Sequence, residues 1–300
     1  MDRKKTVGLM LAVGGAALLA GSCGPAKPPI VVGSKNFTEQ RVLGEIIAQH
    51  LEHRLPGAKI VRELDLGGTL LTYQAMQNRQ ISLYPEYTGT IQAEILKEKP
   101  ANDPAESLIR VRQEMARIAH FDVLDPLGVD DYFVMVVRGE DARKDKLQTI
   151  SDAAHVKDGW KLGVGYEFQQ RLDGMTALSQ YALPMAAPPR SMDLGLMYKA
   201  LEQGQVTMIA ANATDGPLTA HDWVALNDDK KVFGDYQVCI LARDDVLVAE
   251  PRLRPALAQL AGKISNDAMR KLNAAVDVDH RQVSDVAAQF LRDSGLDSSK

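Results

Sequence analysis

The chain has 300 residues, of which 45% are hydrophobic and 25% charged, so it can bury a sizeable core in one large domain or two smaller ones. This composition excludes a collagen, a coiled coil and an intrinsically disordered chain. The formal net charge is -4 at pH 7 and no basic stripe runs along the sequence, so nucleic acid is not an expected partner.

The first predicted element is a secretory signal peptide at residues 1–22. Basic residues at 3–5 precede an apolar run at 7–20, which is shorter than the roughly 20 residues that span a membrane comfortably. Cleavage before Cys23 resembles the processing of bacterial lipoproteins, in which this thiol receives a lipid, and residues 23–29 would form a linker. Simple secretion is the alternative, because Ala stands three positions before Cys23, where Leu is usual. We expect an exported protein of the cell envelope, lipid-anchored on the periplasmic or extracellular face.

From residue 30 onward, short apolar runs alternate with helical patterns, which is the signature of βαβ units around a mainly parallel sheet. Asn36 and Glu39 stand where two side chains would cap the first helix. The first elements predicted are a strand at 30–32, a helix with an apolar face from Val42 to Leu51, a strand at 59–64, a helix from Gly67 to about Asn78, and a strand at 81–83.

An internal similarity indicates two related lobes. Residues 71–83 resemble residues 196–208 at a constant offset of 125 residues, which predicts that one helix-turn-strand unit is used twice. Less regularly, residues 33–41 echo residues 165–171, since each segment follows a Gly with a Phe and then a Gln-Arg pair. Chance matching of amphipathic helices is the alternative explanation.

The lobe boundaries follow from this repeat. We expect the chain to cross near residues 127–129 and to return near residues 232–234, so that lobe 1 comprises residues 30–127 and 234–300 and lobe 2 comprises residues 128–233. Ligands of open α/β sheets bind beyond the carboxyl ends of the strands, and pockets favour domain interfaces. The sequence therefore predicts a ligand cleft between the lobes.

The usual motifs of enzymes and metal sites are missing. The sequence has no G-x-S-x-G, P-loop, H-E-x-x-H or C-x-x-C motif, so we predict no catalytic residue and no cofactor. His50 and His53 share a helical face, which we interpret as solvated rather than metal-binding. Among the paired acids, Asp130 and Asp131 are retained as candidates because they lie at the expected lobe crossing beside Tyr132.

Several motifs follow one another along the chain. They are Gly-Ser-Lys-Asn-Phe-Thr-Glu-Gln at 33–40, Leu-Gly-Gly-Thr at 66–69 and Leu-Tyr-Pro-Glu-Tyr-Thr-Gly-Thr at 83–90, with further segments at 125–128, 166–174, 191–193, 214–216 and 261–265. In this order they resemble the osmoprotectant-binding proteins of ABC importers, a family that binds glycine betaine, choline, carnitine and related compounds. The resemblance implies an α/β, two-lobed periplasmic-binding-protein fold, type II-like, that closes on its ligand and delivers it to a membrane permease.

The resemblance also implies which residues hold the ligand. The family surrounds a quaternary ammonium with four tyrosines, and each ring attracts the cation by about 0.5 to 2 kcal/mol. Tyr87 and Tyr236 match two of these positions. Phe133 and Asn212 occupy the other two, with Tyr132 as a substitute for Phe133 if the local register shifts. We interpret the remaining tyrosines of these segments as packing residues: Tyr73, Tyr84 and Tyr198.

Polar side chains complete the expected site. Asp131 would add a charge contact to the cation, and Lys35 and Arg171 would engage a ligand carboxylate. Thr90 and Gln40 are the expected polar helpers. In the alternative interpretation, Lys35 charges only the rim of the cleft and Arg171 pairs with a nearby acid, Glu167 or Asp173.

We therefore predict a monomeric, non-enzymatic solute-binding component of an ABC importer that takes a quaternary-ammonium or betaine-like ligand. Because half of the tyrosine cage is altered, the alternative is the same fold binding a different zwitterion, such as an amino acid, or a larger trimethylammonium compound. An envelope hydrolase and a structural lipoprotein are the remaining hypotheses. The missing catalytic motifs argue against the first, and the matched cleft residues argue against the second.

Overall fold

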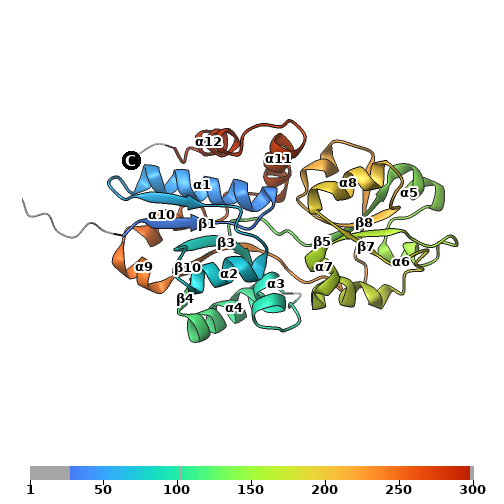
Figure 1. The fold of residues 1–300 in the computed structure, drawn as a ribbon, viewed down its shortest axis with the longest axis horizontal. Coiled ribbons are helices and arrows are strands. Elements are labelled where there is room, and N and C mark those ends of the chain that lie inside the picture. Colours follow the sequence, from blue (N-terminus) through green and yellow to red (C-terminus); the bar gives the residue numbers. More distant parts are fainter. Residues whose placement is uncertain (1–27, 102, 298–300) are drawn as a thin grey trace, which may run out of the picture.

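The computed structural model describes residues 28–101 and 103–297, which form two α/β lobes side by side (Figure 1). The expected signal peptide and Cys23 lie outside the described residues. In the described part of the chain, no helix combines the length and the apolar character that a membrane span requires.

Each lobe is built around a five-stranded sheet. The strand order in lobe 1 is β2 (Ile60–Glu63), β1 (Ile30–Gly33), β3 (Leu83–Tyr87), β10 (Val238–Arg243) and β4 (Phe121–Val123). The strand order in lobe 2 is β7 (Arg190–Met192), β6 (Leu162–Gly165), β8 (Met208–Asn212), β5 (Phe133–Arg138) and β9 (Trp223–Leu226).

The two sheets share one pattern of strand directions. In lobe 1, β1 is parallel to β2 and β3, whereas β10 is antiparallel to its neighbours β3 and β4. In lobe 2, β6 is parallel to β7 and β8, whereas β5 is antiparallel to β8 and β9. The expected mainly parallel sheet is therefore a mixed one. The reversed strand in each lobe is the one that the chain enters directly from the other lobe, so it runs away from the cleft.

Helices cover both faces of each sheet, as Figure 1 shows. Those of lobe 1 are α1 (Thr38–Arg54), α2 (Thr69–Gln77), α3 (Thr88–Thr90), the π-helix η1 (Ile91–Ile95), α4 (Pro104–Ala119), α9 (Asp244–Ala249), α10 (Leu253–Ala258), α11 (Asn266–Asp277) and α12 (Val283–Asp293). Those of lobe 2 are α5 (Gly139–Asp145), α6 (Ile150–Ala153), α7 (Tyr166–Gln170), the π-helix η2 (Leu172–Thr176), the 3₁₀-helix η3 (Ser179–Tyr181), α8 (Leu194–Glu202) and the 3₁₀-helix η4 (Gly216–Thr219).

Alternating strand side chains create a core on each face of each sheet. In β10, Val238 and Ile240 pack into the cluster under α1 and α10, whereas Cys239 and Leu241 pack into the cluster under α2 and α4. Because both faces are covered, β10 is apolar from Val238 to Ala242 instead of alternating with polar residues. Each lobe therefore has its own core.

The predicted repeat is confirmed. The helix α2 and the strand β3 recur as α8 and β8, with every boundary displaced by 125 residues. Two local predictions are wrong. The third strand begins at Leu83 rather than at residue 81, and α1 begins after Phe37 without a side-chain cap because Glu39 is buried toward the cleft.

A third correction concerns the two histidines of α1. His50 is fully buried, and its Nε2 lies 2.9 Å from the carbonyl oxygen of Ala256, so this side of the helix is packed rather than solvated.

Two connecting segments join the lobes. One, at residues 124–132, leads from β4 to β5, and the other, at residues 227–237, leads from β9 to β10. They run antiparallel where Asp130 pairs with Gln237, and the amide of Asp131 donates to the carbonyl of Tyr236 at 3.2 Å. This two-stranded connection places Asp131 and Tyr236 at the base of the cleft.

Candidate functional site

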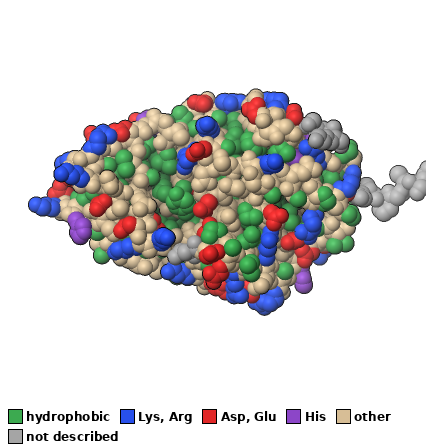
Figure 2. Space-filling model, turned by 180° about the vertical axis from the view of Figure 1, so that it is seen from behind, with side chains coloured by type: hydrophobic (Ala, Val, Ile, Leu, Met, Phe, Trp, Pro, Cys, Tyr) green, Lys and Arg blue, Asp and Glu red, His purple; other side chains and the backbone are tan. Residues whose placement is uncertain are grey.

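A cavity of about 540 Å³ lies between the lobes and is lined from both sides. Figure 2 shows hydrophobic side chains gathered between the two halves of the molecule, with charged side chains of both signs nearby. The cavity sits where β1, β3, β6 and β8 end, as expected for an open α/β sheet. Its size suits a small organic ligand. All the candidate ligand residues except Gln40 line it: Lys35, Tyr87, Thr90, Asp131, Phe133, Arg171, Asn212 and Tyr236.

An aromatic wall forms one side of the cavity. The Phe133 ring lies 4.9 Å from Phe168, 5.9 Å from Phe233 and 5.6 Å from Tyr236, measured between ring centroids. These edge-to-face contacts hold the rings in place. Tyr132 is 39% exposed and does not line the cavity, so it does not substitute for Phe133.

Arg171 lies against this wall but is already paired. Its Nε and Nη2 donate to the two carboxylate oxygens of Asp173 at 2.8 and 2.5 Å, and the Tyr236 hydroxyl also donates to Asp173. The guanidinium lies 5.2 Å from the Phe133 ring centroid, and Nη2 reaches Thr90 Oγ1 in the other lobe at 3.3 Å. The structure therefore has the pair with Asp173 that the sequence offered as an alternative.

Lys35 is neutralised in the same way. Its Nζ lies 2.6 Å from Glu86 Oε1, and the two side chains are 3% and 0% exposed. The ammonium also lies 4.6 Å from the Tyr87 ring centroid and 3.5 Å from Thr69 Oγ1. The two cations that were expected to engage a ligand carboxylate thus each have a buried anionic partner.

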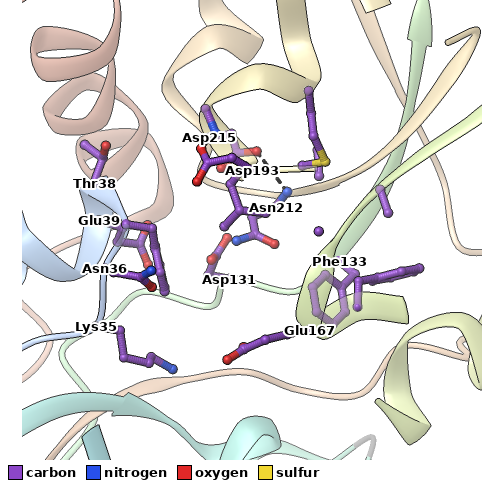
Figure 3. A pocket seen from close by; sticks show the side chains of 18 of the residues that line it. Lys35, Asn36, Thr38, Glu39, Asp131, Phe133, Glu167, Asp193, Asn212 and Asp215 are labelled. Carbon is purple, nitrogen blue, oxygen red and sulfur yellow. Dashed lines mark hydrogen bonds between the residues drawn. The ribbon is translucent and has the colours of Figure 1, made fainter. Parts of the chain in front are cut away.

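The opposite wall is acidic and lies around Glu39, which the sequence analysis treated as a helix cap. Glu39 accepts hydrogen bonds from the Tyr87 hydroxyl at 2.9 Å, from Asn273 Nδ2 at 3.0 Å and from the Thr214 hydroxyl. Thr214 Oγ1 lies 2.7 Å from Asp131 Oδ1 as well. One hydroxyl of lobe 2 therefore bridges two carboxyl groups, those of Glu39 and Asp131, which Figure 3 labels.

Burial changes the acidity of this wall. It raises the pKa of Glu39 and, together with the charges of Glu39 and Asp215, holds the pKa of Asp131 well above its usual range. Asp215 accepts hydrogen bonds from the Tyr198 hydroxyl at 3.0 Å and from the Asn212 amide at 3.1 Å. Burial nevertheless raises the pKa of Asp215 to about 7. Neutral carboxyl groups are therefore available on this wall near neutral pH.

A further hydrogen bond joins the two lobes beside the cavity. Glu167 of α7 accepts a hydrogen bond from the amide of Thr69 at the start of α2, at 3.0 Å. A Cβ on Gly68 would lie 2.1 Å from Glu167 Oε1, so the glycine lets this side chain approach. Figure 3 shows Glu167 pointing across the cleft toward Lys35.

Gln40 has a supporting position. It is buried, and its Oε1 accepts from the amide of Lys35 at 3.3 Å, which steadies the loop after β1 without lining the cavity. Glu39, Asp215 and Tyr198 were not predicted as cavity residues, although each lies within a motif or repeat of the sequence. Tyr198, interpreted as a packing residue, lines the cavity. Within the described residues, no group of three or more potential ligands is arranged to hold a metal ion.

Comparison with known proteins identifies the family. Residues 28–293 match the substrate-binding domain of ABC-type glycine betaine transport systems. The chain belongs to this family. It is 32% identical over 276 residues to a carnitine transport binding protein of Listeria monocytogenes, with 91% of this chain and 89% of the relative covered.

Two further relatives extend the comparison. The chain is 30% identical over 272 residues to the ergothioneine transport permease/ergothioneine binding protein of Helicobacter pylori, with 89% of this chain and 48% of that longer protein covered. A crystal structure described as a glycine betaine/carnitine/choline ABC transporter superposes with a TM-score of 0.77 at 26% identity, and covers 90% of this chain and 100% of that chain.

Family membership confirms the expected fold and role. The protein is an extracytoplasmic solute-binding component of an ABC importer and not an enzyme.

Proposed function

We propose that this protein captures a quaternary-ammonium solute of the betaine type in the cleft and delivers it to an ABC permease. The proposal rests on one observation: the same cavity holds aromatic faces and buried carboxyl groups. These carboxyl groups have no Lys or Arg partner within ion-pair distance among the described residues. A quaternary ammonium cannot donate a conventional hydrogen bond, so π faces and nearby negative charge must recognise it.

The aromatic contribution comes from Tyr87, Phe133 and Tyr236. Tyr87 and Tyr236 are almost fully buried, and Phe133 is half-buried in the wall of the cavity. At about 0.5 to 2 kcal/mol per ring, three rings contribute several kcal/mol to affinity when the cavity is desolvated. Asp131, at the base of the cleft, supplies the negative charge, because a cation bound beside it favours its ionised form despite the pKa that burial raises.

A larger trimethylammonium compound is supported more than a minimal one. Asn212 stands where the family has a fourth tyrosine, and its shorter side chain leaves space and offers an amide to a polar group of the ligand. The relatives named for carnitine and ergothioneine transport are in keeping with a ligand of this kind.

We also propose a lipid-anchored monomer that works with a membrane permease. The support is the signal-like N-terminus ending at Cys23 and the joining of a permease and a binding protein in the relative from Helicobacter pylori. Mass spectrometry of the N-terminal peptide from membrane fractions is expected to find Cys23 diacylated. Light scattering at increasing concentration is expected to find one chain per particle.

The ligand is tested with a panel of glycine betaine, proline betaine, choline, carnitine, trimethylated amino acids and ordinary amino acids. Ligands that bind only the folded state stabilise it and raise the unfolding temperature. At a ligand concentration one hundred times Kd, the free energy of unfolding increases by about 2.7 kcal/mol. Calorimetry then gives the Kd of each stabilising compound. Tighter binding of primary amines than of quaternary amines, or stabilisation by none of the quaternary amines, would overturn the proposed ligand class.

A further inference from the structure

The helix α2 of lobe 1 begins without a capping side chain of its own. It follows Gly68, which has no side chain to accept from the free amides of the first turn. The repeat shows what the equivalent position does in lobe 2. The residue 125 positions later is Asp193, whose Oδ1 accepts a hydrogen bond from the amide of Gly195 in the first turn of α8, at 2.9 Å. The cap of α8 therefore lies in its own lobe, whereas α2 has lost the corresponding cap.

Lobe 2 supplies the missing acceptor. Glu167 Oε1, in the first turn of α7, accepts a hydrogen bond from the amide of Thr69 at 3.0 Å. Gly68 has φ -73° and ψ -176°, which is extended backbone that any residue adopts, so its conformation does not require glycine. The close approach does, because a Cβ on Gly68 would lie 2.1 Å from Glu167 Oε1. The glycine thus removes the cap of lobe 1 and admits the cap from lobe 2.

This contact can form and break at little cost. The Glu167 side chain is 50% exposed, so water can replace the Thr69 amide when the lobes separate. Its Oε2 lies 4.0 Å from Arg171 Nη1 at the end of α7, which holds the carboxylate near the lobe boundary. The first turn of α2 has no such substitute in its own side chains, and negative charge at a helix N-terminus is stabilising. Closure therefore improves the capping of α2.

We propose that Glu167 is a positioning residue that caps α2 only while the cleft is closed, and that it favours closure by the same factor for every ligand. The inference rests on the proposed capture of a ligand in this cleft, but not on the chemical class of that ligand. The apparent affinity of a ligand scales with the population of the state that binds it. A contact that stabilises only the closed lobes therefore raises affinity without touching the ligand.

The experiment compares choline and glycine betaine on the wild type and on Glu167→Ala, with calorimetry for Kd and stopped-flow fluorescence for the rates. We expect both ligands to dissociate faster and both affinities to fall by one common factor, about threefold to tenfold. A loss confined to choline would mean that Glu167 acts as a charge on the ligand. That result, or no loss with either ligand, overturns the inference.

Two variants separate the contact between the lobes from the cap itself. Glu167→Gln keeps an oxygen that can accept from the Thr69 amide, so it should bind both ligands more tightly than Glu167→Ala; equal losses in the two variants would contradict the inference. Gly68→Ser gives α2 a cap from its own lobe, and its Cβ displaces Glu167. The ligand-free Gly68→Ser protein should therefore unfold at a higher temperature than Glu167→Ala, while both affinities stay as low. Wild-type affinity in Gly68→Ser overturns the inference.

Asp103→Ala is the matched control, because Asp103 caps α4 within lobe 1. Its Oδ1 accepts from the amides of Ala105 and Glu106 at 2.8 and 3.0 Å, and the residue does not line the cavity. Losing this cap should lower the unfolding temperature and leave both affinities unchanged.

The two proposals fail separately. If no quaternary amine binds the wild type, the proposed ligand class is wrong, and small-angle X-ray scattering of the ligand-free proteins decides the role of Glu167. The wild type is expected to be more compact than Glu167→Ala, and equal radii of gyration would then overturn the inference. If both ligands bind the wild type and Glu167→Ala equally well, the proposed function stands and Glu167 does not favour closure.

Discussion

Replacing Glu86 by Gln isolates the contribution of the buried ion pair that holds Lys35. The ammonium lies 2.6 Å from Glu86 Oε1, and neither side chain is more than 3% exposed. At an effective dielectric constant of 20, two charges at this distance attract by about 6 kcal/mol before desolvation is counted. Gln keeps the shape and can still accept the hydrogen bond from the Tyr87 amide, but it loses the charge.

The expected result is a loss of about 3 to 5 kcal/mol in the free energy of unfolding, because Lys35 is left as a buried charge without a partner. The same change makes that charge available to the cavity. We therefore expect glycine betaine, whose carboxylate can pair with Lys35, to gain affinity relative to choline.

The assay combines urea unfolding of the ligand-free protein with calorimetry of both ligands. Glu140→Gln is the control, because Glu140 is 71% exposed and lies 3.4 Å from Arg138, and a surface pair of this kind contributes about 0 to 1 kcal/mol. If Glu86→Gln costs no more than this control and leaves the ratio of the two affinities unchanged, the reasoning about Lys35 is refuted.

Three further predictions concern the two walls of the cavity. Tyr236→Ala removes a ring of the aromatic wall and an edge contact of Phe133, so calorimetry should find that a quaternary amine binds at least about tenfold more weakly. Unchanged affinity would mean that this ring does not contact the ligand. Asn212→Tyr adds an aromatic face to the lobe 2 side of the cavity and should tighten glycine betaine binding about threefold to tenfold, whereas weaker binding would mean that Asn212 hydrogen-bonds the ligand. Burial raises the pKa of Asp215 in the folded state to about 7, so the folded protein holds this proton at pH values where the unfolded chain has lost it. The contribution of this group to the free energy of unfolding is therefore complete below about pH 4 and is lost as the pH rises through 7. Asp215→Asn should flatten this decline in urea-unfolding measurements of the ligand-free protein between pH 4.5 and 8, and an unaltered slope would contradict the assignment.

Much of the fold followed from local pattern. The repeat of α2 and β3 in α8 and β8 was legible because the same helix and strand periodicities recur at a constant offset. The reversed strands β5 and β10 were not predictable in this way. Their direction is set by where the chain enters each lobe, and residues near in sequence carry no signal for that.

The sequence motifs predicted part of the candidate site. The order of the motifs alone predicted that Phe133 and Asn212 take the place of two tyrosines, and both residues line the cavity. The partner of Arg171 was among the alternatives, because Asp173 is only two residues away.

Only the tertiary structure decided which charged side chains of the cavity have a partner within the protein. Lys35 and Glu86 are 51 residues apart, Glu39 and Thr214 are 175 apart, and Glu39 and Asn273 are 234 apart. Sheet topology and the two-stranded connection bring these side chains together, and no local periodicity records such pairings. A sequence therefore suffices to place an aromatic ligand cleft between two lobes. Whether Lys35 is free to bind a ligand carboxylate depends on a long-range contact, which here pairs it with Glu86, whereas Arg171 is paired with Asp173 from two residues away.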